Sequence, residues 1–415
     1  MAVSDWTFEL SLAQSVLARY SRLLHAAAGD GHHVVSPLGA WMVVAMCGGL
    51  GATDAVARSD LAGVLGADPM AAADFAATLL ARPHPLVAAA AGLWVRARFD
   101  TAGVRQWSAR LPEQVDTGDI PSQEELDRWA TDRTLGLIRQ FPLAVTDEVT
   151  CAIASALATK VSWKVPFEVV DAAELGSSRW SASLSRVLTT PEDPRHRQFL
   201  TDTPGAGPVA VHLGSARGGL LVGSVIASDP AVPPGQVLAE AERIVAAEAV
   251  GPGSVPRLSL FKLPLGAGPV WDIAKERGES QGPHDAQERF TTIMPAWSAS
   301  TELDLAAPDD LGFPAAAAAI ARAQGLEDWE FLARQSSVAR YDAVGFQAAA
   351  VTALMTLLSG HQPRSHRAIL RRATITFRHP YAVVAATFND WQEPSPAAWQ
   401  GLPVFSAWVA EAEDA

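Results

Sequence analysis

Cysteine and long apolar runs are scarce in this chain of 415 residues. Its two cysteines, Cys47 and Cys151, both lie in apolar segments, where a free thiol behaves as a small buried side chain. We therefore expect two reduced thiols and no disulfide. The longest apolar runs, such as the one that begins at Ala40, stop short of the ~18 residues that a membrane helix needs, so we expect no membrane partner.

Positive charge is also scarce, because 32 Lys and Arg residues stand against 45 Asp and Glu residues and give a net charge of −13. The basic residues are spread along the chain without forming a basic stripe, and no zinc-finger spacing or RNA-binding aromatic motif occurs, so we expect no nucleic-acid partner. The first ten residues lack the basic region and apolar run of a Sec-type signal peptide. The missing signal peptide predicts a cytoplasmic protein, and we expect a monomer that uses no cofactor and no metal.

Hydrophobic residues make up 49% of the chain, which is enough for a large buried core. Apolar side chains at helical spacing predict a helix over residues 5–28, and Ser122 with Glu125 has the spacing of a capping box. The apolar segments 85–99 and 149–163 are interpreted as central strands. Strands dominate from about residue 180, interrupted by helices near 235–250 and 313–325. This order predicts a mixed α+β fold with its helices gathered early.

Two short motifs invite a chemical interpretation. Ser259 and Lys262 have the Ser-x-x-Lys spacing of penicillin-binding enzymes, but the partner motifs of that class are missing, so we interpret the pair as residues of a strand. His32 and His33 are adjacent, yet no carboxylate or third His stands at ligand spacing, so we interpret them as a solvated turn. Neither motif supports an enzyme, and a Ser-x-x-Lys hydrolase is kept only as a minor alternative.

The order of several longer segments resembles that of the serpin family of serine protease inhibitors. The stretch VVSPLGAWMVVAMCGGLGATDAVARSDLAGVLG is similar to the family's Ser-Pro-Leu segment with its two helices, and SALATKVSWKVPF is similar to its central strand. MPAWSASTELDL and FRHPYAVVAATFND are similar to two later strands. The residues that carry the resemblance include Ser36, Pro37, Leu38, Gly51, Ala52, Thr53, Ala156, Lys160, Trp163, Phe167, Trp297, Phe377, His379, Pro380 and Tyr381.

This resemblance spans about residues 10 to 409, and it implies a bacterial-type member with a single serpin-like domain over 1–415. The implied fold packs N-terminal helices on a large, mainly antiparallel mixed sheet beside smaller sheets. It also implies an exposed reactive-centre loop at about 345–372. The location implied by analogy with the family is extracellular, which stands as the alternative to the cytoplasm.

The segment AVGFQAAAVTALMT has divided conformational preference, since Ala favours helix whereas Gly, Val and Thr favour other structures. It resembles the proximal hinge of the reactive-centre loop, which a protease attacks and which then inserts into the main sheet. Phe346 stands where the family has Thr, and Ala343 and Val344 stand where it has Glu. The hinge residues are Gly345, Phe346, Gln347, Ala348, Ala349, Ala350, Val351 and Thr352.

Alternation along an inserted strand implies that compact or apolar side chains face the interior. By resemblance this inward set is Phe346, Ala348, Ala350, Thr352, Leu354, Thr356 and Leu358. The family's usual hinge-to-cleavage length places the scissile bond near Leu358, Ser359 or Gly360, which implies an elastase-like or subtilisin-like target. Arg364 and Arg367 are the rival, trypsin-like sites. A non-inhibitory serpin-fold binding or chaperone-like protein is the alternative function.

Overall fold

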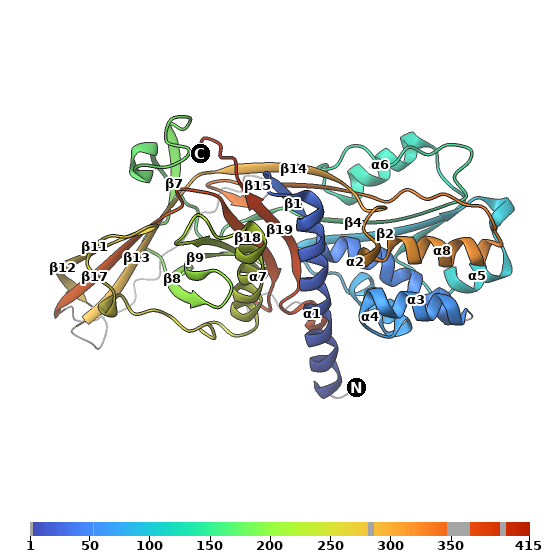
Figure 1. Cartoon of the computed structure of the whole chain (residues 1–415), viewed down its shortest axis with the longest axis horizontal. Helices are drawn as coiled ribbons and strands as arrows, with labels where there is room; N and C mark the ends of the chain where they lie inside the picture. Colours follow the sequence, from blue (N-terminus) through green and yellow to red (C-terminus); the bar gives the residue numbers. More distant parts are fainter. Residues whose placement is uncertain (1–2, 53, 281–285, 347–365, 391–395) are drawn as a thin grey trace.

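The computed structural model of the chain describes residues 3–52, 54–280, 286–346, 366–390 and 396–415. Figure 1 shows an elongated molecule, with most of the helices in one half and a twisted arm of strands at the other end. The helices are α1 (Val3–Ala28), α2 (Pro37–Met46), α3 (Ala55–Leu65), α4 (Pro69–Ala81), α5 (Ala102–Ser108), α6 (Gln123–Arg133), α7 (Pro234–Val250) and α8 (Phe313–Gln324).

Two six-stranded sheets form one half of the molecule. The first has the order β1-β19-β18-β10-β9-β8 and is covered by α7, and the second has the order β11-β12-β17-β13-β7-β6. The strands of the first are β1 (His33–Val35), β8 (His196–Thr203), β9 (Gly207–Ala216), β10 (Leu220–Ala227), β18 (Tyr381–Thr387) and β19 (Pro403–Val409). Those of the second are β6 (Glu168–Asp171), β7 (Arg186–Thr189), β11 (Gly266–Ala267), β12 (Trp271–Ser280), β13 (Ala286–Met294) and β17 (His366–Thr376).

Two smaller sheets run along the helical half. One has the order β3-β2-β4 and the other β14-β15-β16-β5. Their strands are β2 (Val87–Val95), β3 (Val115–Gly118), β4 (Cys151–Thr159), β5 (Val161–Ser162), β14 (Trp297–Asp304), β15 (Arg334–Tyr341) and β16 (Gly345–Phe346). The predicted strands of segments 85–99 and 149–163 are confirmed as β2 and β4. β2 is central as expected, whereas β4 lies at the edge of its sheet among the described strands.

Local sequence signals account for several helix starts. Ser36 accepts a hydrogen bond from the Gly39 amide at the start of α2, and Pro37 occupies the first turn. Ser122 and Glu125 form the predicted capping box of α6. Both cysteines are free, Cys47 buried and Cys151 half-buried, as expected. Among the described residues, no single helix is long and apolar enough to cross a membrane, and only α3 and α4 together, bent by 65°, meet that length and composition.

Two local interpretations of the sequence are wrong. His33 is not in a solvated turn: it is 3% exposed in β1, because β1 pairs with β19 from the far end of the chain. His32 is half-buried, and its Nε2 lies 2.7 Å from the Ser298 carbonyl. Lys262 ends a short 3₁₀ helix (Leu260–Lys262) and is not on a strand, and Ser259 is the N-cap of that helix, where its hydroxyl accepts from the Phe261 amide.

A buried polar network joins α1, α7, β1 and β19. The Ser21 hydroxyl donates to the Glu242 carboxyl and lies 3.2 Å from Ser406 Oγ. His25 links Ser406, 2.8 Å from its Nε2, to His33, 2.6 Å from its Nδ1. Burial raises the pKa of Glu242 to about 8 and lowers that of His25 to about 3, so both groups are neutral near pH 7.

The raised pKa of Glu242 predicts a loss of stability in alkaline solution. A carboxyl that titrates near 4.5 in the unfolded chain and at about 8 in the folded one stabilises fully below pH 4.5, and this contribution disappears as the pH rises through 8. The free energy of unfolding of Glu242→Gln should therefore equal that of the parent at pH 4.5 and exceed it by a few kcal/mol at pH 8. Urea unfolding at both pH values measures this difference. The exposed control Glu174→Gln should show no such gain, and equal behaviour of both variants would contradict the assignment.

Candidate functional site: an open slot between two strands

The described parts of β4 and β15 run alongside each other with free edges. All nine residues of β4 pair with β2, and all eight of β15 pair with β14. Between these two facing edges, the described residues supply a bridging strand only at one end, where the two-residue β16 pairs with β15 and with β5. We call the remaining space the slot. Its two edges present backbone groups that an additional strand would satisfy.

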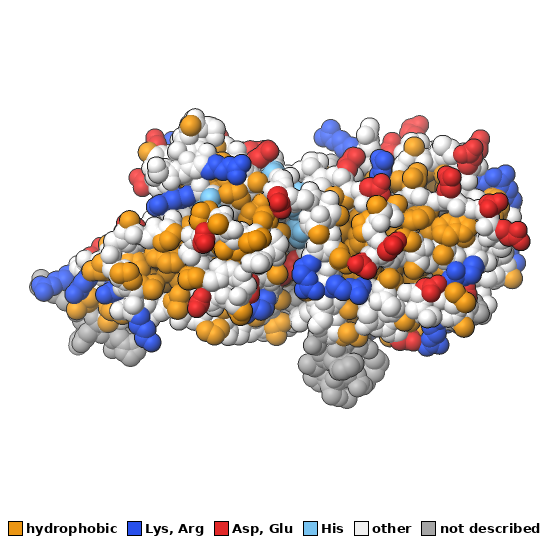
Figure 2. Space-filling model, viewed as in Figure 1, with side chains coloured by type: hydrophobic (Ala, Val, Ile, Leu, Met, Phe, Trp, Pro, Cys, Tyr) orange, Lys and Arg blue, Asp and Glu red, His pale blue; other side chains and the backbone are white. Residues whose placement is uncertain are grey.

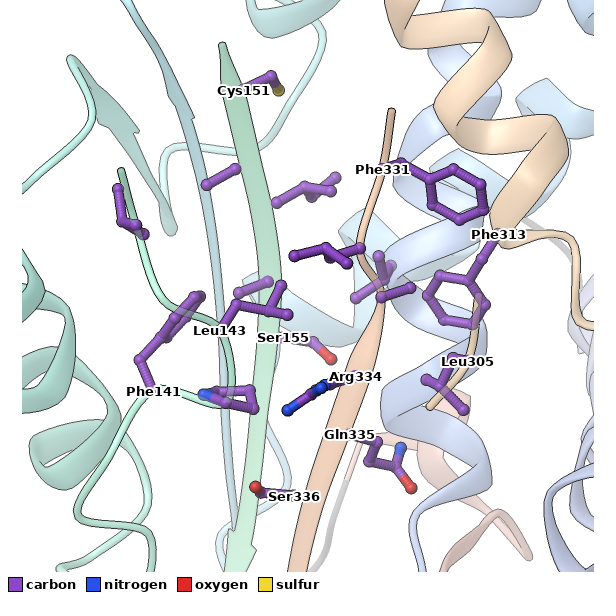
Figure 3. Close-up of a pocket in the computed structure, with 18 of the residues that line it drawn as sticks. Phe141, Leu143, Cys151, Ser155, Leu305, Phe313, Phe331, Arg334, Gln335 and Ser336 are labelled. Atoms are coloured by element: carbon purple, nitrogen blue, oxygen red, sulfur yellow. The ribbon is translucent and has the colours of Figure 1, made fainter. Parts of the chain in front are cut away.

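A cavity of about 1020 Å³ occupies the slot and extends beneath the segment that follows α6. Figure 3 shows Phe141 and Leu143 on the β4 side, Phe313 and Phe331 on the β15 side, and Arg334 extending from β15 toward β4. A cavity that is bounded by two strand edges and floored by apolar side chains suits an extended peptide segment.

Two of the predicted hinge residues, Gly345 and Phe346, lie in the sheet. Gly345 pairs with Ser162, and Phe346 pairs with Val161 on one side and with Tyr341 on the other. The Phe346 side chain is 2% exposed, and its ring centroid lies 6.4 Å from that of Trp297. The unusual Phe at this position therefore has a pocket in the protein, where full burial of a Phe contributes ~1.5–3 kcal/mol.

Aromatic side chains and backbone hydrogen bonds hold this end of the slot closed. The amides of Trp163 and Phe167 donate to the carbonyls of Val344 and Ala343, at 3.0 and 2.9 Å. The rings of Trp163 and Phe167 lie 4.9 and 5.7 Å from that of Tyr341. The segment that leads into the hinge is thus fixed to the body of the protein.

Two buried histidines pack behind Phe167. His196 Nε2 lies 2.8 Å from the Val165 carbonyl and so donates to it, and His196 Nδ1 then accepts from His212 Nε2 at 3.0 Å. Burial lowers the pKa of both imidazoles, and each also faces the other, so the pair is neutral at pH 7.

Asp342 shapes the turn between β15 and β16, a role that the sequence analysis missed. Its Oδ1 accepts from the amides of Val344 and Gly345 at 2.9 and 3.0 Å, and its carbonyl accepts from the Trp163 indole at 2.9 Å. An Asp three residues before a Gly is a common signal of such a side-chain-capped turn and could have been found in the sequence.

Removal of the Asp342 carboxylate should loosen the hinge. Asp342→Ala leaves two amides without their acceptor, and loss of a comparable cap costs about 0.5–2 kcal/mol. We expect faster hydrogen exchange at Gly345 and Phe346 and a small fall in stability. Asp342→Asn retains an acceptor oxygen and is the matched control. Unchanged exchange in the Ala variant would mean that the aromatic contacts alone position the hinge.

The predicted site residues lie in several parts of the protein, and many of them lie outside the described residues. Trp163 contacts the hinge turn, whereas Lys160 is exposed between β4 and β5. His379 and Pro380 are half-buried between β17 and β18, and Ser36 caps α2 behind the sheet. Arg367 lies in β17, opposite Glu279, so the strand begins inside the range expected for the loop. Outside the described residues lie Gln347, Ala348, Ala349, Ala350, Val351, Thr352, Leu354, Thr356, Leu358, Ser359, Gly360 and Arg364.

The arrangement of the whole chain matches that of solved serpin structures. Serpin48 of the insect Tenebrio molitor aligns with a TM-score of 0.59 at 12% identity, covering 100% of both chains. The thermophilic serpin tengpin in its native state aligns at 0.58 and 9% identity, covering 99% of this chain and 95% of its own. Human thyroxine-binding globulin complexed with thyroxine aligns at 0.60 and 12% identity, covering 97% and 99%. No protein-family model and no curated protein matches the chain. The protein has the α+β serpin fold, as the sequence predicted.

Proposed function

We propose that the protein inhibits serine proteases as a suicide substrate whose cut loop enters the slot. The observation that carries this proposal is the slot itself, which has two free strand edges and the first two hinge residues already in register at its end. A short strand that is paired on both sides and followed by open edges provides a nucleus from which insertion can continue.

Continuing the register of Phe346 assigns neighbours to each inward residue of the loop. Positions 348, 350 and 352 would enter between Thr159 and Ala339, between Leu157 and Ser337, and between Ser155 and Gln335. Positions 354 and 356 would follow between Ile153 and Ala333 and between Cys151 and Phe331. All these flanking residues are odd-numbered, like the buried Val161 and Tyr341, so their side chains lie on the same face of the strands. The even-numbered loop positions opposite them would therefore face inward.

The chemistry of these positions agrees with the loop sequence. Thr352 would meet Ser155 and Gln335, whose side-chain oxygens are bonding partners for its hydroxyl. Leu354 would meet Ile153 and Ala333, which are apolar. At these two positions, a polar and an apolar loop residue coincide with polar and apolar neighbours in the proposed register.

In the proposed reaction, the protease serine attacks the scissile carbonyl, and the amine of the next residue leaves with a proton. The loop then remains joined to the protease by an ester. Insertion of its N-terminal part carries the protease away before water cleaves that ester. Leu358 or Ser359 is the proposed attachment point, and an elastase-like or subtilisin-like protease is the proposed target. Cleavage after Arg367 would require unpairing of β17, which weighs against that rival site.

Incubation with elastase-like, subtilisin-like and trypsin-like proteases, followed by denaturing electrophoresis, tests this function. A covalent band at the summed mass of inhibitor and protease is expected with the first two. Clean nicking without such a band would favour the second candidate, a non-inhibitory binding protein. The structural similarity to thyroxine-binding globulin in its complex with thyroxine is the reason to retain this candidate. The hydrolase alternative loses support, because the Ser259 hydroxyl donates to Glu288 at 2.6 Å.

A further inference from the structure

Four buried polar groups behind the hinge turn have no partner among the described residues. They are the hydroxyls of Ser224, Tyr341 and Tyr381 and the Nδ1 atom of His212, and all four residues are 0% exposed. None of these atoms makes a hydrogen bond within the described part of the chain. We call them the polar cluster. Buried polar atoms of native proteins are almost always hydrogen-bonded, either to protein groups or to ordered water, so this cluster needs a partner.

Strand register places three members of the polar cluster on one face of the first six-stranded sheet. Ser224 of β10 lies opposite His212 of β9, so their side chains are neighbours. On its other edge, Ser224 lies opposite Val383 of β18. Tyr381 comes two residues before Val383 and therefore projects from the same face of the sheet. The three side chains form a row across three neighbouring strands.

Tyr341 reaches this row from the strand that leads into the hinge. Its ring and that of His212 both contact Phe167, at centroid distances of 5.7 and 5.3 Å. Burial raises the pKa of both tyrosines, while the neighbouring Ser224 hydroxyl opposes the rise at Tyr341 and Tyr341 adds to the rise at Tyr381. The four groups are therefore close together, and both phenols keep their protons at pH 7.

The polar cluster contains an acceptor that no described group serves. His196 Nε2 donates to the Val165 carbonyl, so His196 Nδ1 accepts from His212 Nε2. The neutral His212 ring then has only a lone pair at Nδ1, which needs a donor. Both rings are buried, and Figure 2 shows histidine only as small patches on the face that it draws. Each hydroxyl of the cluster can both donate and accept, so the cluster offers donors and acceptors to a bridging molecule.

The polar cluster lies between two segments that hold the hinge. Tyr341 pairs with Phe346 across the hinge turn. Beyond the histidine pair, Val165 lies between Trp163 and Phe167, whose amides hold the segment that leads into the hinge. A continuous chain of hydrogen bonds from Tyr341 to the Val165 carbonyl would therefore join both sides of the turn.

We propose that the polar cluster binds ordered water, which completes a hydrogen-bonded relay from Tyr341 through Ser224 and the two histidines to Val165. A buried water makes about three hydrogen bonds to groups that otherwise lack partners, which matches this cluster. A charged ligand would find no counter-charge here, because all four groups are neutral, and an apolar ligand would leave them unsatisfied. The inference is independent of protease inhibition, because it concerns how the uncut protein holds residues 341–346.

A high-resolution crystal structure of the uncut protein tests the water directly. We expect density for at least one water within about 2.5–3.2 Å of two or more atoms of the polar cluster. A cluster without water would overturn the proposal, including one in which the four side chains bond directly to one another.

Hydrogen exchange tests the relay. Ser224→Ala alters β10, outside the hinge turn, yet it should speed exchange of the Gly345 and Phe346 amides by about two- to tenfold, the factor that one lost hydrogen bond represents. Tyr341→Phe should do the same. The control Tyr20→Phe removes another buried hydroxyl, which donates to a backbone carbonyl at 2.9 Å. This control should lower the thermal midpoint but leave exchange at the hinge like that of the parent.

The double variant shows whether the two hydroxyls share one bridge. Tyr341→Phe/Ser224→Ala should exchange no faster than the faster of the single variants, since either change already breaks the relay. Multiplied effects in the double variant would mean two separate contacts and would refute the relay. Parent-like exchange in Ser224→Ala would refute it as well.

Discussion

Cutting the loop between Leu354 and Arg367 should raise the thermal midpoint of the protein by on the order of 10 °C or more. Among the described residues, no strand pairs with the facing edges of β4 and β15 along the slot. In the proposed mechanism, the uncut protein is therefore not in its state of lowest free energy. A new central strand would complete the sheet and cover the cavity floor. A net gain of about 5 kcal/mol suffices, since 1 kcal/mol moves the midpoint of a large domain by roughly 2 °C.

Limited proteolysis followed by calorimetry measures this change, with mass spectrometry to identify the cut bond. The two fragments must remain associated, which gel filtration verifies. An unchanged or lower midpoint after complete nicking of an associated pair would argue against insertion. It would leave the serpin fold intact and favour the binding-protein alternative.

Local signals explain which parts of the fold the sequence predicted well. The capping box of Ser122 and Glu125 and the apolar segment of β4 depend on residues close together in the chain, and both appear as expected. His33 shows the opposite case. Next to His32 and two residues after Gly31 it resembles a turn residue, but β1 is buried by pairing with β19, more than 370 positions away.

The candidate site also combines features with a signal in the local sequence and features that depend on distant strands. The proposed hinge was assigned through the resemblance of Gly345 and the alanines after it to the serpin loop, because the local pattern alone is equally typical of a surface helix. The burial of Phe346 could not, since its pocket is formed by Trp297 and Tyr341 from other strands. The C-terminal end of the loop was expected at about residue 372, whereas β17 begins at His366. β17 pairs there with β12, and no local sequence pattern predicts that pairing.

The two ends of the loop are held unequally, and this difference determines which end can move in the proposed mechanism. The proximal end of the loop is a two-residue strand at the mouth of the slot, whereas the distal end belongs to an eleven-residue strand with neighbours on both sides. Cleavage separates these ends. The proximal part can then move into the slot while β17 stays in place, and an attached protease moves with the proximal part.

Replacement of Ala350 by Arg should abolish inhibition without slowing cleavage. In the proposed register, position 350 enters between Leu157 and Ser337, which are 8% and 3% exposed. An arginine there would bury an unpaired charge at an effective cost of several kcal/mol. Before insertion the same charge costs little if it is hydrated, because most surface substitutions lie within ~0.5 kcal/mol.

The matched control is Ala349→Arg, which by alternation places the same charge on the outer face of the inserted strand. Deacylation of the protease competes in time with insertion, so a slower insertion converts an inhibitor into a substrate. Ala350→Arg should be cut at the parent bond at a similar rate, form no covalent complex and gain no thermal stability. Ala349→Arg should retain most of its inhibition. The number of inhibitor molecules consumed per protease inactivated measures the contrast, and equal values for the two variants would exclude insertion in this register.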